Sequence, residues 1–202
     1  MAVLSRRKSE TSEQRREAEA SFLLATAALL AEGSSYADLS IEQISRQAGR
    51  SRTAFYFYFR DKRDLLMRVT EEIAHQLYDE ADRWWSGAGG PADLRAAIES
   101  ILVTYRGHAS LLSAVVEAST YDDAVGDFWR ELIGRFVDAT ERRIAAEGGV
   151  GPDAASAKAF CLVWMTERAC YQQVARGGRL DDGTLVDALV DIWERSVYAG
   201  RP

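Results

Sequence analysis

Apolar residues recur along this chain at the three- and four-residue spacing of amphipathic helices. The longest apolar run, Ala20 to Ala31, is interrupted only by Ser21 and Thr26 and is typical of a helix packed in a core. The sequence contains no alternating strand pattern, no sustained heptad and no internal repeat. The pattern therefore predicts an all-α fold of about nine helices.

Glycine, proline and helix-capping residues separate the predicted helices from one another. Ser40 and Gln43 have the spacing of a capping box, and Ser51 is a favourable N-cap. Gly49 marks a tight turn between two short helices, which is the helix-turn-helix pattern. The expected helices span about residues 13–32, 40–48, 52–58, 61–85, 92–105, 110–120, 123–146, 153–176 and 180–198.

The chain has 202 residues, a length that allows one large domain or two small ones. We place a helix-turn-helix domain with an N-terminal arm at 1–60 and a second helical domain at 61–202. No segment reaches the roughly 18 apolar residues of a membrane span, and the polar start lacks a secretory signal. We therefore expect no membrane partner and a cytoplasmic location. The segment Arg6-Arg7-Lys8 is either an arm that contacts DNA or a solvated tail.

Charge is distributed unevenly between these two parts. The net charge of −6 argues by itself against a nucleic-acid partner. Residues 1–60, however, carry nine Lys/Arg against seven Asp/Glu, whereas residues 61–202 carry sixteen against twenty-four. Phosphate would repel the acidic part, which would orient the molecule on DNA.

The predicted helix at 52–58 combines aromatic and cationic residues in an unusual way. At 100° per residue, Phe55 lies at the back of the helix, toward the core, with Tyr58 near it; Phe59, just after the helix, is expected in the core as well. The front offers a guanidinium group, two hydroxyls and an aromatic edge, which are groups that contact bases and phosphates. The alternative is an aromatic core helix with solvated cations. The residues of the front face are Arg52, Thr53, Tyr56 and Phe57.

Cations stand at two predicted helix starts, where they oppose the helix dipole. Arg52 begins one helix, and Lys62 and Arg63 begin the next. A phosphate docked at these N-termini would relieve the mismatch, and the start of the helix at Ser40 makes a third site of this kind.

Residues 39–66 resemble the DNA-binding segment of the TetR family of repressors. The resemblance implies contacts of the front face with bases or nearby phosphates, and of three further residues with the backbone: Ser40, Tyr58 and Lys62. Arg50 and Arg60 replace a small residue and a proline of the family pattern and add charge, while Ala54 removes a common threonine. The predicted DNA-contacting residues are Ser40, Arg50, Ser51, Arg52, Thr53, Tyr56, Phe57, Tyr58 and Lys62.

The second part of the chain holds all five tryptophans, which suits either a plain core or a ligand cavity. Its segments 165–168 and 192–200 are similar to the ethionamide-resistance-type repressors of the TetR family, which hold an apolar tunnel for hydrophobic ligands. Where those relatives carry amides, this chain has Val163 and Thr166, so we expect fewer polar ligand contacts. The positions that correspond to the tunnel lining are Trp129, Trp164, Met165, Thr166 and Trp193.

The last two predicted helices are amphipathic, and the resemblance implies that they form a four-helix bundle in a twofold dimer. Glu167 and Arg168 lie in an otherwise apolar stretch, and we expect an ion pair between helices or subunits there. Cys161 and Cys170 lie too far apart on one helix for a disulfide, so both are predicted to be buried free thiols. The apolar faces comprise Phe160, Val163 and Glu167 on one helix and Leu185, Leu189, Ile192 and Ser196 on the other.

The function expected from these features is that of a ligand-responsive, dimeric repressor. It would bind a palindromic operator and be released by a hydrophobic small molecule. The alternative is a helical carrier of hydrophobic ligands without a DNA-binding function. No motif indicates a cofactor, a metal site around His75 and His108, or the catalytic apparatus of an enzyme.

Overall fold

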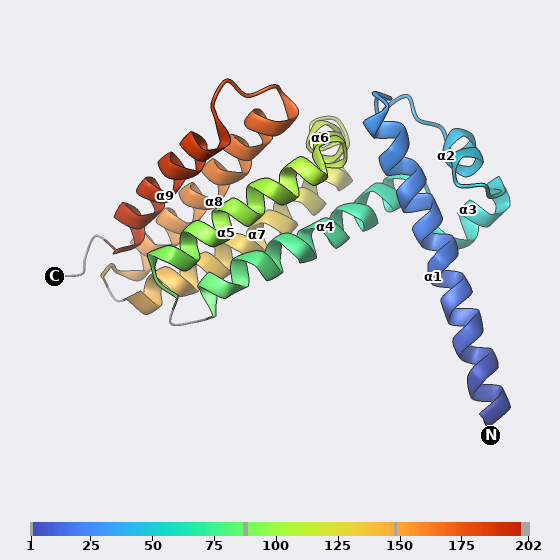
Figure 1. Ribbon diagram of the computed structural model, residues 1–202, viewed down its shortest axis with the longest axis horizontal. Helices are drawn as coiled ribbons and strands as arrows, with labels where there is room; N and C mark the ends of the chain where they lie inside the picture. Colours follow the sequence, from blue (N-terminus) through green and yellow to red (C-terminus); the bar gives the residue numbers. More distant parts are fainter. Residues whose placement is uncertain (1, 87–88, 148, 199–202) are drawn as a thin grey trace. The chain divides into compact units, whose positions relative to one another are not determined.

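The computed structural model describes the backbone of residues 2–86, 89–147 and 149–198, and the side chains in these ranges from residue 13 onward. Within the described ranges the chain forms nine α-helices and no strands (Figure 1), which confirms the all-α prediction. The helices are α1 (Ala2–Ala31), α2 (Ile41–Gln47), α3 (Arg52–Tyr58), α4 (Lys62–Trp85), α5 (Pro91–Gly107), α6 (Ala109–Ala118), α7 (Asp123–Glu147), α8 (Pro152–Ala175) and α9 (Asp182–Tyr198).

Eight of the helices begin and end within a few residues of their predicted limits, and α1 is the exception. It begins at Ala2, whereas the apolar pattern predicted a start near residue 13. The segment 6–8, suggested as an arm, falls within this helix, and its side chains lie outside the described residues. The pattern missed these turns because they carry few apolar residues, which are the signal for an amphipathic helix.

The chain divides into two compact units, 1–69 and 70–202. The first unit packs α1, α2 and α3 with the beginning of α4 around a core of aromatic side chains. Phe22 of α1 contacts Phe55 and Phe59 edge-on, with ring centroids 5.5 and 5.9 Å apart, and all three are almost fully buried. Edge-to-face pairs of this kind stabilise a core beyond their area of burial.

The second unit contains the rest of α4 and helices α5 to α9. In it α7 packs along α8, and α5 packs along α9. Of the residues predicted to form a bundle face on α8 and α9, Val163, Glu167, Leu185 and Leu189 are instead buried within the chain. Phe160 and Ile192 remain exposed, by 57% and 43%.

The structure also tests the sequence expectations about the two cysteines and about membrane-spanning segments. Cys161 is exposed on α8 while Cys170 is buried, so the prediction of two buried thiols holds only for Cys170. Nine residues on a helix turn through 900°, which places the two side chains on opposite faces of α8. Among the described helices, none is both long enough and apolar enough to cross a membrane.

Candidate nucleic-acid interface and ligand cavity

Local caps define the start of each short helix in the first unit. Ser40 Oγ accepts a hydrogen bond from the Gln43 backbone N–H (3.2 Å), and Gln43 Oε1 accepts one from the Ser40 N–H (2.8 Å). This confirms the predicted capping box. Ser51 Oγ caps α3 by accepting a hydrogen bond from the Ala54 N–H (3.1 Å). Between the helices, Gly49 has a φ of 64°, a conformation that favours glycine.

The two faces of α3 differ in burial as the angular pattern predicted. Phe55 and Phe59 are almost fully buried, and Tyr58 is intermediate. Tyr56 and Phe57 are 49% and 69% exposed, an unusual state for large aromatic side chains. The buried rings hold α3 rigidly while its other side is left open to a partner.

Cationic side chains accompany these exposed rings. Arg52 donates a hydrogen bond to the Tyr56 hydroxyl (3.3 Å), which raises the pKa of Arg52, and its guanidinium lies 5.7 Å from the Tyr56 ring centroid. The Arg15 guanidinium of α1 lies 5.6 Å from the ring centroid of Phe57. Arg15 was not among the predicted contact residues, because no local spacing relates it to a residue 42 positions later. The other predicted contact residues at this surface, Ser40, Arg50, Ser51 and Thr53, are also exposed.

Lys62 has a role in the fold that the sequence did not reveal. Its ammonium group donates hydrogen bonds to the carbonyl oxygens of Tyr36 (2.9 Å), Ala37 (2.8 Å) and Leu39 (3.0 Å). An ammonium group has three donors, so these bonds use all of them. Burial lowers the pKa of Lys62, and the negative charge of Asp38 opposes this effect.

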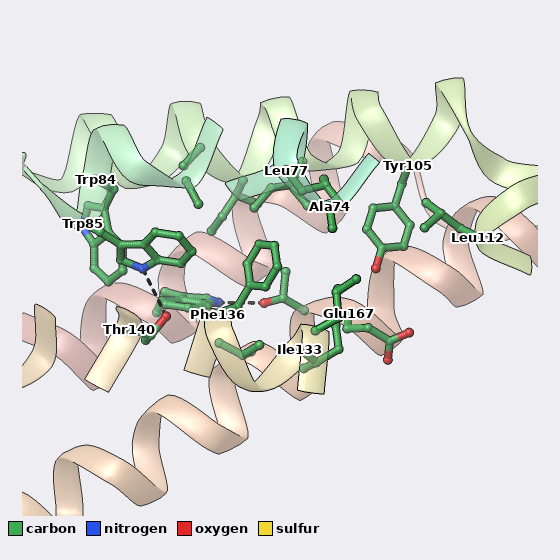
Figure 2. A pocket seen from close by; sticks show the side chains of 18 of the residues that line it. Ala74, Leu77, Trp84, Trp85, Tyr105, Leu112, Ile133, Phe136, Thr140 and Glu167 are labelled. Carbon is green, nitrogen blue, oxygen red and sulfur yellow. Dashed lines mark hydrogen bonds between the residues drawn. The ribbon is translucent and has the colours of Figure 1, made fainter. Parts of the chain in front are cut away.

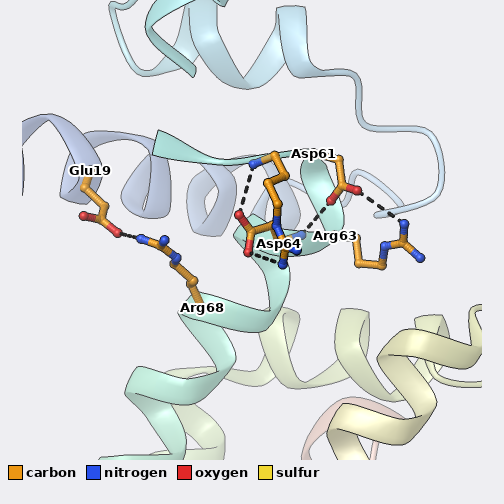
Figure 3. A network of polar contacts seen from close by, with 6 residues as sticks. Glu19, Asp61, Arg63, Asp64 and Arg68 are labelled. Atoms are coloured by element: carbon orange, nitrogen blue, oxygen red, sulfur yellow. Dashed lines mark hydrogen bonds and ion pairs between the residues drawn. The ribbon is translucent and has the colours of Figure 1, made fainter. Parts of the chain in front are cut away.

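Carboxylates compensate the cations at the beginning of α4. Asp61 accepts a hydrogen bond from the Asp64 N–H (2.8 Å), and its carboxylate lies 3.3 Å from Arg63. Asp64 pairs in turn with Arg60 at 3.3 Å. Figure 3 shows Asp61, Arg63 and Asp64 at this helix start. Although burial opposes the shift, these hydrogen bonds lower the pKa of Asp61. Negative charge at a helix N-terminus satisfies the dipole, so a phosphate is not needed to relieve the mismatch that the sequence suggested at α4.

The second unit encloses an apolar cavity of about 80 Å³. Its lining comes from α4 to α9, and Figure 2 shows Trp84 and Trp85 toward one end and Tyr105 and Glu167 toward the other. An apolar cavity of roughly 150 Å³ holds one benzene molecule, so any larger ligand requires side chains to move apart.

Three of the five predicted tunnel residues line this cavity, namely Trp129, Thr166 and Trp193. Trp164 and Met165 are not among the residues that line it. On α8 the lining residues are Val163, Thr166 and Glu167, which share one face at a spacing of three and four residues. Residues one and two positions after Val163 are rotated by about 100° and 200° from that face.

Hydrogen bonds already occupy the hydroxyl groups of two threonines in the lining. Thr166 Oγ1 accepts a hydrogen bond from Trp193 Nε1 (2.8 Å) and donates one to the Leu162 carbonyl (2.9 Å). Thr140 Oγ1 accepts a hydrogen bond from Trp85 Nε1 (3.2 Å). These bonds orient two indole rings along the cavity wall, and they engage the Thr166 hydroxyl that the sequence suggested for a ligand.

Glu167 also lines the cavity, although it was not among the predicted tunnel residues. Its side chain is 3% exposed, and its charged neighbour is Arg168, with Nε at 3.5 Å from Oε2. Burial raises the pKa of Glu167, and Arg168 partly opposes this shift. Among the described residues this ion pair joins neighbours on one helix and not two helices, while the expected alternative of a pair between subunits stays a prediction. Its position four residues after Val163 could have indicated that it faces the cavity.

Comparisons with known proteins agree with this division into two units. Residues 23–69 match the family described as "Bacterial regulatory proteins, tetR family", and residues 94–199 match "Transcriptional regulator EthR, C-terminal domain". The second match by itself covers more than half of the chain. The chain belongs to the TetR family of transcriptional regulators. The family resemblance of the sequence is thereby confirmed, and a DNA-binding regulator is favoured over a ligand carrier.

Full-length relatives within the TetR family extend the match across both units. The HTH-type transcriptional regulator EthR of Mycolicibacterium smegmatis is 31% identical over 191 residues, which cover 89% of this chain and 86% of that protein. The regulator of the same name from Mycobacterium tuberculosis strain H37Rv is 29% identical over 187 residues, with 87% and 85% covered. These names indicate a transcriptional regulator and not an enzyme.

Solved structures of other TetR-like regulators share the fold at low sequence identity. A protein from Syntrophomonas wolfei assigned to the TetR family has a TM-score of 0.75 at 15% identity, with 90% of this chain and 96% of that chain covered. FadR from Bacillus subtilis, solved in complex with stearoyl-CoA, has a TM-score of 0.67 at 17% identity, with 88% and 96% covered.

Proposed function

We propose that this TetR-family member is a ligand-responsive repressor that binds a palindromic operator as a dimer and is released by a hydrophobic small molecule. The observation that carries the DNA-binding half is the open face of α3. Two large aromatic side chains are exposed there beside two guanidinium groups, on a helix whose other side is packed in an aromatic core. Such a face combines phosphate-binding and base-contacting groups.

The proposed contact set follows from exposure and chemistry. Arg52, Thr53, Tyr56 and Phe57 would meet bases and the nearest phosphates, with Arg15 as an addition from α1. Ser40, Arg50, Ser51 and Tyr58 would meet the backbone. Lys62 stays in the proposal as a positioning residue, because its three donors hold the segment that precedes α2.

Dimerisation through α8 and α9 is supported by the apolar side chains that a single chain leaves exposed on them. Phe160 and Ile192 are large, apolar and exposed, and Trp164 beside Phe160 is half-buried. A twofold dimer also meets a need of the function. One short recognition helix reads few base pairs, whereas two helices about one DNA turn apart read a palindrome.

The proposed coupling between ligand and DNA runs through α4. This single helix begins at Lys62, and further along it Ala74, Leu77, Ala81 and Trp84 line the cavity. A ligand that widens the cavity on this side would displace side chains of α4, which would favour a different position of the helix. Release of DNA then requires a ligand that binds more tightly to the state with the non-binding spacing.

A gel-shift experiment with DNA from upstream of the gene tests the proposal. Wild type is expected to form a salt-sensitive complex that depends on sequence. Arg52→Ala and Tyr56→Ala should each weaken operator binding about 10- to 100-fold, because each removes a contact worth on the order of 1–3 kcal/mol.

Arg130→Ala is the matched control, because it removes an exposed arginine of α7 in the second unit. Its operator affinity should equal that of wild type, and all three variants should keep the wild-type sedimentation coefficient. If the two α3 variants bind as tightly as the control, the assigned contact face is wrong.

A further inference from the structure

Glu167 places an unsatisfied carboxylate at the apolar cavity. Neither carboxylate oxygen has a hydrogen-bond partner among the described residues, although both atoms are shielded from solvent. Of the described residues that line the cavity, Glu167 is the only one that carries a charge. Buried carboxylates are almost always paired or hydrogen-bonded, so a carboxylate without a hydrogen bond in a cavity wall is unusual and points to a missing partner.

The surrounding protein groups do not satisfy this carboxylate. The guanidinium group of Arg168 approaches to 3.5 Å without forming a hydrogen bond, and it lies 5.1 Å from the Tyr171 ring centroid with half of its side chain exposed. The hydroxyl of the neighbouring Thr166 is engaged by Trp193 and Leu162. A donor that enters from the cavity would satisfy this carboxylate.

The other lining residues indicate what kind of molecule could carry this donor. The wall is built from aliphatic and aromatic side chains, and its threonine hydroxyls at positions 140 and 166 are occupied by indole N–H groups. In Figure 2 the Trp84 and Trp85 end offers an apolar surface, while Glu167 and Tyr105 lie toward the other end. A molecule with an apolar body and one cationic donor fits both ends.

We propose that the effector is a hydrophobic amine whose ammonium group binds the Glu167 carboxylate. The inference rests on the proposed function, in which this cavity is the effector site. A protonated amine supplies both the hydrogen bonds and the countercharge that the carboxylate lacks. An apolar carboxylic acid would place a second negative charge beside Glu167, and an apolar ester would leave it without a donor.

The test compares three probes of equal chain length on the intact protein: n-octylamine, octan-1-ol and octanoic acid. Binding is measured at pH 7.5 by isothermal calorimetry and by quenching of tryptophan fluorescence. The amine is protonated at this pH. Its Kd should be about tenfold or more below those of the alcohol and the acid, as expected for a charge-assisted hydrogen bond.

Glu167→Gln removes the negative charge of the side chain and keeps its shape, so it tests the effect of the charge on binding. The variant should lose the preference for octylamine and keep the affinity for octan-1-ol within about twofold, because the glutamine oxygen can still accept a hydrogen bond from a hydroxyl but offers no countercharge to an ammonium group. Glu131→Gln, at an exposed position on α7, is the matched control and should retain the preference. Circular dichroism and the melting temperature check that both variants are folded.

The outcomes distinguish this inference from the function on which it rests. If the probes bind wild type without preference for the amine, or if Glu167→Gln retains the preference, the amine assignment is overturned while the cavity remains a ligand site. If none of the probes binds wild type, both the amine assignment and the proposed effector site fail. Octylamine that binds selectively and weakens the complex with operator DNA supports both.

Discussion

At the scale of single residues, Lys62 shows that a cation near a helix start can have backbone carbonyl groups as its partners instead of a phosphate. Its ammonium group lies at the beginning of α4, where a bound phosphate would be attractive, but three carbonyl oxygens already surround it. Those carbonyls belong to the segment between α1 and α2, so the side chain joins parts of the chain 23 to 26 residues away. Its position near the proposed DNA-contacting face therefore follows from a fold-stabilising role.

Lys62→Ala should destabilise the first unit. It leaves three carbonyl groups without their donor, and we expect a loss of about 1–3 kcal/mol in the free energy of unfolding, measured by urea denaturation. Operator affinity should fall as a consequence of the looser 36–39 segment. A variant of unchanged stability with weakened DNA binding would show instead that Lys62 contacts phosphate directly.

Glu167 provides a second prediction at this scale, on pH. Burial raises its pKa in the folded chain above the unfolded value, so the protonated form is favoured by folding. Its contribution to stability is therefore greatest below the unfolded pKa and is lost as the pH rises through the folded pKa. The titratable and charged groups that interact with it are Arg168, Tyr105 and Cys170.

Glu167→Gln should accordingly stabilise the ligand-free protein at pH 8, by about 1 kcal/mol, because it removes a buried charge that lacks hydrogen bonds. The difference from wild type should shrink toward pH 5. Urea denaturation at the two pH values measures it, and a variant that is less stable than wild type at pH 8 would contradict the assignment of an uncompensated carboxylate.

At the scale of elements, the stability of the short helices α2 and α3 depends on the residues at their ends. Helices of seven residues are too short to be stable by themselves, so caps and tertiary packing must hold them. The ends are fixed by the capping box at Ser40, the cap at Ser51 and the left-handed turn at Gly49. The aromatic core beneath α3 supplies the packing.

Gly49→Ala isolates the contribution of the turn. A methyl group added there would meet no atom within 4 Å, so the cost comes from the positive φ alone. We expect a loss of about 1–2 kcal/mol. Gly134→Ala in α7 is the matched control, since it also adds a methyl group in open space, and it should gain roughly 0.5–1 kcal/mol from helix propensity. Equal effects of the two changes would contradict the role assigned to the turn.

At the scale of the whole molecule, the chain forms two compact units, and the single helix α4 belongs to both. The first unit presents an open cationic and aromatic face, and the second holds an apolar cavity with one charged side chain in its described lining. Because α4 belongs to both units, its position is the variable on which the proposed effector would act. The family membership of the chain agrees with this arrangement.

The sequence by itself determined the helices apart from the start of α1, the caps of α2 and α3, and the division of aromatic residues between the two faces of α3. These features depend on interactions within a few residues, and helical periodicity expresses them directly. It also indicated three lining residues of the cavity through the family resemblance.

Only the tertiary structure decided the partners of Lys62, the pairing of Arg15 with Phe57, and the exclusion of Trp164 and Met165 from the cavity. Each depends on contacts between distant parts of the chain or on which face of a helix turns inward. The orphan carboxylate of Glu167 belongs to the same group. A missing hydrogen bond can be recognised only when all the neighbours of a buried atom have been placed.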